Sequence, residues 1–415
     1  MQLIIFVFFT CTFQISIFVR SNKMIVGMHN GHYVFTQLCR FLPKRAFDCL
    51  VDKYEGNKYV KSFTCWNHLL VLIFGQLSNR ESLRDLIGIL DAHKKKFYHL
   101  GFGKSVTRSN LSKANEVRSI DVFEKFSLKL IDCIKSNNTQ IVDLETDSNI
   151  YAFDSSIITL CINTFWWAKQ RKGTGGIKLH TLYDIKNQIP TFNVITDQLT
   201  SDCTLMDIIP YETNAFYLFD KAYVSTPQLY AINLIDAFFV VRKKLNMKYK
   251  VLTDKNYNNP QTGIMADQII IFTSRIAQKG YPDKLRSVVY YSKELKTTFS
   301  FLTNNLDITA EEVATLYKYR WNIEIFFKWI KQHLRIKEFY GTSENAVKIQ
   351  IFSAIITYCL VTIMKHELKI KVSTYEILRI LSLSLFERMP IENLFNNNDT
   401  QINYQNDTQL CLNFF

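Results

Sequence analysis

The sequence lacks the paired cysteines that structural metal sites commonly use. Its nine cysteines are scattered along the chain, and no two of them are spaced as C-x-x-C. The eight histidines show no zinc-finger spacing either. We therefore expect no structural zinc site. We interpret the cysteines as reduced, mostly buried thiols of a cytosolic protein.

The first nineteen residues, MQLIIFVFFTCTFQISIFV, lack charge altogether. A secretory signal carries its positive charge before the apolar run, whereas Arg20 and Lys23 follow it, and no A-x-A cleavage site is visible. A membrane anchor fits the length only marginally. We favour a mis-assigned start codon, with Met24 or Met28 as the true beginning, because nothing downstream looks secreted. Residues 1–23 are then dispensable, and no stable membrane partner is expected.

The charge balance is strongly basic. Fifty Lys and Arg residues oppose 37 Asp and Glu residues, which gives a net charge of +13. A large protein this basic usually binds a polyanion, and a solubilising surface charge is the alternative. The 415 residues suggest two or three domains, and an apolar content of 47% permits a sizeable core.

Helical periodicity dominates the first third of the chain. Residues 35–54, 62–90 and 121–136 carry apolar side chains at three- and four-residue spacing. Much later, residues 350–364 are too short to span a membrane, and we expect them to form a buried core helix.

A polar segment, residues 101–119, interrupts the first helical region. It holds Lys104, Arg108, Lys113 and Arg118 among Ser, Thr and Asn residues. Such a segment can contact phosphates through both charges and hydroxyl groups. A solvated loop with a short helix explains the same composition.

From about residue 148 the pattern changes to that of strands. The expected strands are 150–160, 175–185, 189–199, 214–224, 236–245, 268–274, 285–294 and 297–305. Residues 200–210 are polar to amphipathic and could form a helix, and helices return from 310 to 385. A mixed sheet flanked by helices, with an inserted β-rich piece, explains this order.

Two aspartates occupy similar positions in this region. Asp154 follows Tyr-Ala-Phe and Asp220 follows Ala-Phe-Tyr-Leu-Phe, both in otherwise apolar strands. An acid in such a strand is costly unless it is paired or binds a metal ion. A turn at the strand end is the alternative for either residue alone. Asp202 and Asp207 lie near Asp220 in the sequence and compete with it for any role.

A third carboxylate, Glu324, stands on a predicted amphipathic helix. At 100° per residue, Tyr317, Arg320, Glu324 and Lys331 share a stripe roughly 60° wide, with Trp321 at its border. The alternative is an exposed face with ordinary ion pairs such as Arg320–Glu324. Three carboxylates from separate elements could hold two divalent cations about 4 Å apart and support phosphoryl transfer.

The spacing Tyr317–x2–Arg320–x3–Glu324–x6–Lys331 matches the YREK signature at all four positions. FDSSIITL and YLFDKAYV are similar to the two aspartate strands of the same proteins, and GTGGIKLHTLYD, with Lys178 and His180, is similar to the strand between them. On these motifs the chain resembles, over roughly residues 28–390, the transposases of the insertion-sequence-four family, the DDE group.

The resemblance implies an RNase H-like α/β fold: a mixed sheet with flanking helices, a β-rich insertion and a helical N-terminal DNA-binding domain. Asp154 would lie on the first strand, Asp220 on the fourth and Glu324 on a later helix. These three acids would be the catalytic residues and would bind Mg²⁺ or Mn²⁺, with two ions expected.

The implied partner is double-stranded DNA, both transposon ends and target, bound by a homodimer in the cytoplasm at the nucleoid. Trp321 is a candidate for stacking on a displaced base. The residues expected to contact DNA are Tyr317, Arg320, Trp321, Lys331, Lys178 and Arg108.

The implied activity is metal-dependent cleavage and strand transfer of DNA at terminal inverted repeats, that is, cut-and-paste transposition. The alternatives are a catalytically inactive, transposase-derived DNA-binding protein and a membrane-anchored protein led by residues 2–19. The expected domains are an apolar extension (1–23), a helical DNA-binding domain (24–140), a catalytic core (148–232 and 309–388), a β-rich insertion (233–308) and a flexible tail (389–415).

Overall fold

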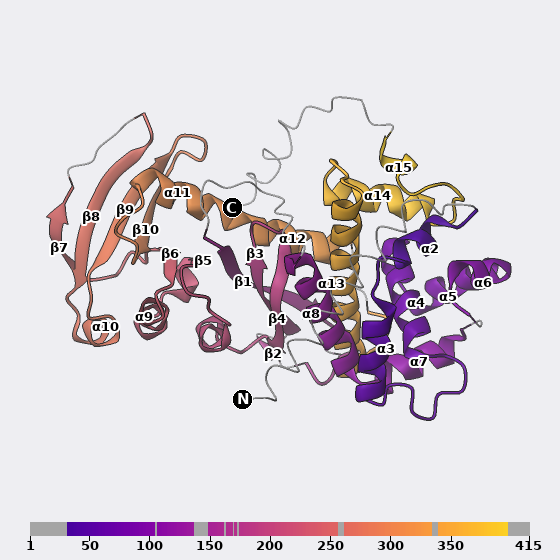
Figure 1. Cartoon of the computed structure of the whole chain (residues 1–415). Helices are drawn as coiled ribbons and strands as arrows, with labels where there is room; N and C mark the ends of the chain where they lie inside the picture. The colour runs from indigo at the N-terminus through magenta and orange to yellow at the C-terminus, as the bar shows by residue number, and fades with distance from the viewer. Residues whose placement is uncertain are drawn as a thin grey trace, which may run out of the picture. The chain divides into compact units, whose positions relative to one another are not determined.

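A computed structural model describes residues 31–103, 106–136, 148–161, 163–168, 170–171, 174–255, 261–333 and 339–396. The described chain divides into two compact units (Figure 1). Unit 1 contains the residues up to 136 and those from Trp329 onward, and unit 2 contains residues 148 to Lys328. The predicted extension 1–23, Lys104 and the predicted tail from residue 397 lie outside the described residues.

Unit 1 is helical, as the periodicity of the first third predicts. Its first part comprises α2 (Val34–Cys39), α3 (Lys44–Lys53), α4 (Cys65–Leu77), α5 (Leu83–Ala92), η2 (Lys94–Lys96), α6 (Phe97–Leu100), α7 (Arg108–Val117) and α8 (Ile120–Ser136). Side chains that prefer helix starts define several of these boundaries. Thr64 accepts a hydrogen bond from the Asn67 amide at the start of α4, and Ser82 accepts one from the Asp85 amide at the start of α5.

The later part of unit 1 is built around α13 (Glu344–Glu367), which packs on α4, α7 and α8. Nearly every side chain from Ala346 to Met364 is buried, so the predicted core helix 350–364 is confirmed. Among the described residues, α13 is the one helix long and apolar enough to cross a membrane, and 94% of its apolar window is buried inside the protein. α14 (Thr374–Ser384) and α15 (Asn393–Asn396) complete the unit.

Ten strands of unit 2 join in one mixed sheet within the described residues. Its order is β2-β3-β1-β5-β6-β10-β9-β8-β7, with β4 also paired to β3. The strands are β1 (Ile150–Leu160), β2 (Gln170–Arg171), β3 (Thr174–Asp184), β4 (Ile189–Asp197), β5 (Phe216–Phe219), β6 (Phe238–Arg242), β7 (Tyr249–Asp254), β8 (Ile264–Phe272), β9 (Leu285–Ser292) and β10 (Thr297–Thr303).

The centre of this sheet has the RNase H-like arrangement that the sequence predicts. β3 is antiparallel to both β1 and β4, whereas β5 is parallel to β1 and β6 is parallel to β5. Parallel strands are normally buried on both faces, and β5 consists of four consecutive buried residues. A cluster of buried side chains that includes Phe153, Tyr217 and Phe219 involves these strands.

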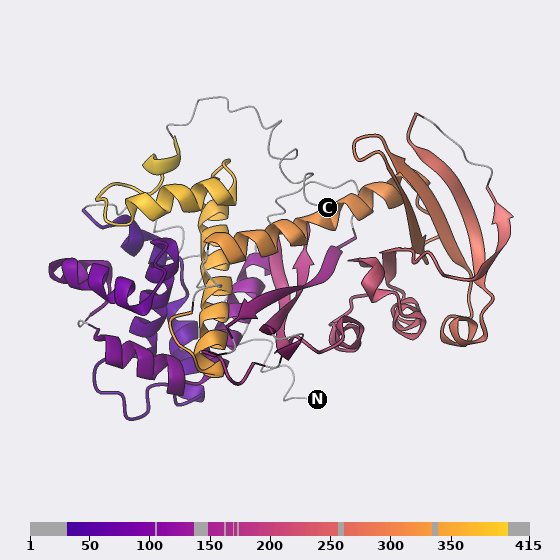
Figure 2. The same cartoon turned by 180° about the vertical axis from the view of Figure 1, so that it is seen from behind.

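The β-rich insertion extends the same sheet through β10, β9, β8 and β7 (Figure 2). β6, which the predicted insertion 233–308 includes, pairs in parallel with β5, and the start of the insertion at residue 233 stays a prediction. β10 then pairs antiparallel with β6. α9 (Thr226–Leu234) packs on β6, and α10 (Arg275–Gly280) packs on β8.

The predicted helix that carries the YREK signature is two helices in the structure. α11 (Ala310–Tyr319) starts with a capping box formed by Thr309 and Glu312, and α12 (Trp321–His333) follows directly. Arg320 stands at the turn between them. α12 runs from unit 2 into unit 1, so the compact units divide the predicted core segment 309–388 at Lys328.

Candidate active site

Two carboxylates lie where the parallel pairing of β1 and β5 ends. β1 and β5 are paired up to Ala152 and Leu218, and Asp154 and Asp220 each lie two residues further along. The same register, continued, places the two acids side by side. Asp220 stands at the strand end, where it begins the short helix η4 (Lys221–Tyr223).

Asp154 is a mostly buried carboxylate with three donors around it. Its Oδ1 accepts hydrogen bonds from the Ser155 amide at 2.8 Å and from the Tyr223 hydroxyl at 3.4 Å. Its Oδ2 accepts one from Arg320 Nη1 at 3.2 Å. Burial raises the pKa of Asp154 to about 6, against the lowering effect of Arg320 and of the Ser155 amide, while Glu324 and Asp220 raise it further. The three predicted acids thus share one electrostatic environment.

Arg320 connects the strand acids to the helix acid. Its guanidinium is bonded to Asp154 Oδ2 through Nη1 and to Glu324 Oε1 through Nη2. The residue is only 8% exposed. Burial opposes its charge, but Tyr317, Glu324 and Asp154 outweigh burial and raise the pKa of the guanidinium. The predicted pair Arg320–Glu324 is therefore present, and it is part of a bridge that joins β1 to α12.

A further carboxylate, Asp202, lies near Asp154 and is connected to it through Ser155. Asp202 Oδ1 accepts hydrogen bonds from Ser155 Oγ at 2.8 Å and from Lys178 Nζ at 3.1 Å. His180 Nδ1 lies 3.8 Å from the same oxygen, and burial lowers the pKa of His180 to about 4. The predicted helix 200–210 is a 3₁₀ segment, η3 (Asp202–Ile208), which begins with this aspartate.

Lys178, which was expected to contact DNA, is buried in this network. Its ammonium group donates to the Thr200 carbonyl oxygen at 2.7 Å as well as to Asp202. Its side chain is 8% exposed, so in this structure it faces protein groups and not solvent. A DNA contact by Lys178 stays a prediction. In the structure Lys178 donates to Asp202, which also accepts a hydrogen bond from Ser155, the residue next to Asp154.

The other predicted DNA contacts are divided between the units. Tyr317 lies in unit 2, where its ring centroid is 4.5 Å from that of Phe301, and Trp321 starts α12 with a half-exposed side chain. Lys331 and Arg108 lie in unit 1. The structure therefore gathers Tyr317, Arg320 and Trp321 in the same unit as the three acids.

The donor chemistry of the site fits a hard divalent cation. Carboxylate oxygens are the ligands that Mg²⁺ prefers, and Asp154, Asp220 and Glu324 supply three carboxylates. Among the described residues, however, no three His, Cys, Asp or Glu side chains are already close enough to hold a metal ion. In this structure the Arg320 guanidinium supplies the positive charge between Asp154 and Glu324.

Two supporting residues carried little signal in the sequence. Tyr223 donates to Asp154 from three residues beyond Asp220, and Ser155 connects Asp154 to Asp202. Both are part of the strand segments FDSSIITL and YLFDKAYV, but nothing in those segments shows which side chains turn toward Asp154. The cysteines also differ from expectation: of the seven described, all free, only Cys65 and Cys359 are buried.

Comparison with known proteins places the chain in a family. The model of the transposase DDE domain matches residues 145–360, and a domain of unknown function, DUF4372, matches residues 30–103. A Sinorhizobium fredii protein described as a transposase is 36% identical over 54% of this chain and 64% of its own length. A Geobacillus stearothermophilus protein described as a transposase for an insertion sequence element is 28% identical over 61% of this chain and 66% of its own length.

Two further similarities are broader and weaker. A Synechocystis protein described as a transposase for an insertion sequence element is 25% identical over 80% of this chain and 88% of its own length. The cryo-electron-microscopy structure of a piggyBac transposase synaptic complex with hairpin DNA covers 90% of this chain and 84% of its own chain, at 10% identity and a TM-score of 0.44.

The transposase DDE model covers more than half of the chain, including β1, β5 and α12 with their acids. The first two relatives are matched over slightly less than two thirds of their own length. The chain belongs to the family of proteins that carry the transposase DDE domain.

Proposed function

We propose that this protein is a transposase that cleaves DNA at the terminal inverted repeats of an insertion sequence and joins the freed ends to a target, in a cut-and-paste reaction. The observation that supports the proposal best is the convergence of Asp154, Asp220 and Glu324 in a unit with an RNase H-like sheet. The transposase DDE match covers the same residues.

In this proposal Asp154, Asp220 and Glu324 hold Mg²⁺ or Mn²⁺, with two ions expected. Such ions, when bound, stabilise the attacking and leaving oxygens of a phosphoryl transfer. The chain's own residues prepare the site for them. Arg320 keeps Asp154 and Glu324 together and charged, and the Ser155 amide and the Tyr223 hydroxyl hold the carboxylate of Asp154 in place.

Arg320 has a second role in this proposal. Once the acids have another positive partner, its guanidinium is available to a DNA phosphate, which guanidinium groups recognise through paired hydrogen bonds. Tyr317, Trp321 and Lys331 on α11 and α12 would contact the transposon end beside it. Arg108 in unit 1 would contact the DNA backbone. We also propose that the protein acts as a homodimer on paired ends, in the cytoplasm.

The test is cleavage of DNA that carries the element's ends by purified full-length variants with Mg²⁺ or Mn²⁺. Asp154→Asn, Asp220→Asn and Glu324→Gln keep size but remove charge, so each should reduce nicking by roughly a thousandfold or more. Because the three acids act on one transition state, a variant that lacks two of them should nick DNA only slightly more slowly than a variant that lacks one. All of them should still bind DNA.

Asp207→Asn is the matched control, because Asp207 is exposed on η3 close to the site in sequence. It should nick at the wild-type rate. If Asp220→Asn stays active while Asp207→Asn or Asp202→Asn is inactive, the second acid is wrongly assigned. Activity in all three proposed acid variants would overturn the catalytic proposal.

One observation favours a second candidate, a transposase-derived DNA-binding protein without catalysis. Arg320 bridges Asp154 and Glu324, so these two acids already have a positive partner. An inactive protein would bind end-containing DNA but would not nick it with either metal ion. The same assay on the wild-type chain therefore separates the two candidates.

A further inference from the structure

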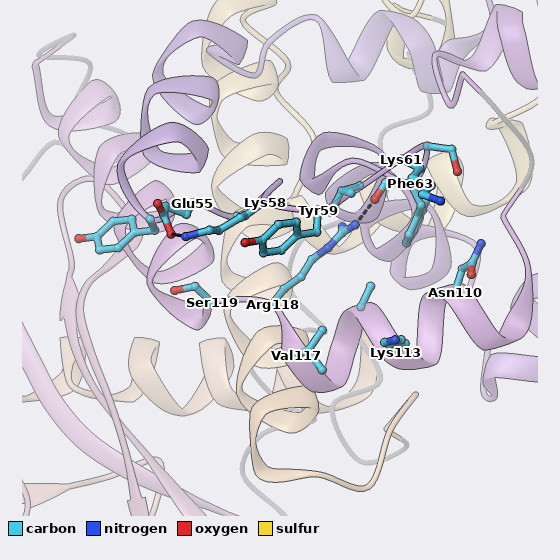
Figure 3. A pocket seen from close by; sticks show the side chains of 15 residues that line it. Glu55, Lys58, Tyr59, Lys61, Phe63, Asn110, Lys113, Val117, Arg118 and Ser119 are labelled. Carbon is cyan, nitrogen blue, oxygen red and sulfur yellow. Dashed lines mark hydrogen bonds and ion pairs between the residues drawn. The ribbon is translucent and has the colours of Figure 1, made fainter.

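A cavity in unit 1 lies apart from the three acids and has no role in the mechanism above. It has a volume of about 720 Å³ and lies between the loop that joins α3 to α4 and the helix α7 (Figure 3). The loop contributes Lys58, Tyr59 and Lys61, and α7 contributes Asn110 and Lys113 from the opposite side. Its size lies within the range of small-ligand sites, roughly 300–1,000 Å³.

The charged side chains of this cavity are mostly basic. Its single acid, Glu55, is paired with Lys58 at 2.6 Å. Lys61 and Lys113 are exposed, and neither has an ion-pair partner in the described part of the chain. Two unpaired ammonium groups on opposite sides of one cavity favour an anion between them.

Arg118 fixes the walls of the cavity. Its guanidinium donates to the Phe63 carbonyl oxygen and, at 2.9 Å, to the Thr64 carbonyl oxygen. It also lies 4.9 Å from the centroid of the Phe63 ring. The Arg118 carbonyl oxygen accepts a hydrogen bond from Asn345 Nδ2 at 2.8 Å. Arg118 therefore joins the last residues of the loop to the end of α7, and Asn345 of α13 bonds to Arg118.

Tyr59 presents an aromatic ring to solvent at this site. The residue is 93% exposed, and its backbone has φ of 60°, in the left-handed region that bulky residues rarely adopt. Burial of the ring does not explain this conformation, because the ring packs against little of the protein. A strained residue at a cavity is a reason to examine function. The ammonium group of Lys58 lies 5.9 Å from the centroid of the Tyr59 ring, and the ring lines the same cavity as Lys61 and Lys113.

We propose that this cavity binds one unpaired nucleotide of the DNA substrate, with its phosphate at Lys61 and Lys113 and its base on the ring of Tyr59. Aromatic stacking combined with basic side chains is the common chemistry of single-stranded DNA binding. A base within a duplex is already stacked on both faces and leaves no face for Tyr59. The inference rests on the proposed function, because it names a site for the same substrate.

The experiment compares the affinity of the full-length chain for a blunt duplex and for the same duplex with a single-stranded tail, without divalent metal so that no cleavage occurs. The wild type should prefer the tailed DNA by roughly fivefold or more, as one base–aromatic contact allows. Tyr59→Ser and the double variant Lys61→Gln/Lys113→Gln should lose that preference. Tyr59→Phe should keep it, because it retains the ring.

The controls separate the site from general effects. Tyr59→Ser and Tyr59→Phe both keep a side chain at φ of 60°, so backbone strain is the same in the pair. Lys94→Gln/Lys95→Gln removes two exposed charges elsewhere in unit 1. It should lower the affinity for the blunt and the tailed duplex by the same factor. An unchanged preference in the cavity variants, or an equal loss on both DNAs, overturns the nucleotide site while DNA binding itself persists. A wild-type chain that binds neither DNA refutes the proposed function itself.

Discussion

A single guanidinium holds together acids from two different elements. The Arg320 side chain is 10% exposed and bonds to Asp154 on β1 and Glu324 on α12. Exposed ion pairs contribute little, but removing one member of a buried set leaves an uncompensated charge. Arg320 therefore supplies the compensating positive charge for both Asp154 and Glu324 in this structure.

Asp202 should act as a positioning residue for Asp154. Asp202→Asn removes the charge that opposes buried Lys178, and it weakens the contact through Ser155 that fixes the strand at Asp154. Loss of such supporting partners typically lowers metal affinity or activity roughly 10- to 100-fold. We expect a higher concentration of Mg²⁺ or Mn²⁺ to be needed for half-maximal nicking, while Asp207→Asn leaves this concentration unchanged.

Folding of this variant has its own check. The double variant Asp202→Asn/Lys178→Met removes both charges of the buried pair, which is less harmful to folding than removing one. It should fold and still need more metal ion than the wild type. A wild-type metal requirement in both variants would show that Asp202 stabilises the fold and has no influence on the site.

The candidate acids were predictable from the sequence, and their partners were not. An aspartate in an otherwise apolar strand is conspicuous, because burial of an unpaired charge is unfavourable. The burial of Lys178 depends on Asp202 and the Thr200 carbonyl, which are more than twenty residues away. Such long-range contacts leave no local pattern, so the sequence suggests a DNA contact for Lys178 and not its burial against Asp202.

At the scale of elements, the spacing of apolar residues and the burial of each strand explain which strands and helix boundaries the sequence predicted and which it did not. β1 and β3 bury most of their side chains, β4 leaves most of its own half-buried, and all three were expected close to their observed bounds. β7 was missed, because it is an exposed edge strand whose side chains lack a buried face. The break at Arg320 was also missed, because a single turn residue barely changes helical periodicity.

Two helical glycines offer a matched test of packing in unit 1. A Cβ atom on Gly75 of α4 would lie 2.7 Å from the Tyr340 hydroxyl oxygen and 3.0 Å from Leu86 Cδ2. That hydroxyl donates to the Arg80 carbonyl oxygen, so it cannot move freely. Gly75→Ala should destabilise unit 1 by about 1–3 kcal/mol, as overpacking usually does.

Gly88 of α5 is the opposite case, because a Cβ atom there would meet no atom of a neighbouring element within 4 Å. Gly88→Ala should therefore stabilise the unit by about 0.5–1 kcal/mol through helix propensity alone. The free energy of local opening, measured by hydrogen exchange of the helix amides, gives both values. Equal effects of the two substitutions would show that Tyr340 does not restrict the space beside α4.

At the scale of the whole molecule, the helical unit is assembled from both ends of the described chain. Residues up to 136 supply α2 to α8, and the chain returns after unit 2 to supply α13. Thr357 on α13 donates to Gln76 Oε1 at 2.7 Å, and Gln76 Nε2 donates to the Gln350 carbonyl oxygen at 3.2 Å. The expected domain 24–140 therefore lacks its central helix when taken alone.

A fragment of residues 24–140 should consequently fail to fold, because α4, α7 and α8 would expose the apolar faces that α13 covers. Joining 24–140 to 329–396 through a flexible linker should restore cooperative unfolding, followed by circular dichroism. In the linked fragment, Ile355→Asp places a charge at a fully buried position and should abolish cooperative unfolding. Lys348→Gln, on the solvent side of α13, should not.

The linked fragment should also bind DNA, because α13 then holds α7 and the loop that joins α3 to α4 in place. Its affinity for DNA should fall steeply as salt rises. Cooperative unfolding of 24–140 alone, with the same salt-dependent DNA binding, would show that α13 is an addition to this unit and not its core.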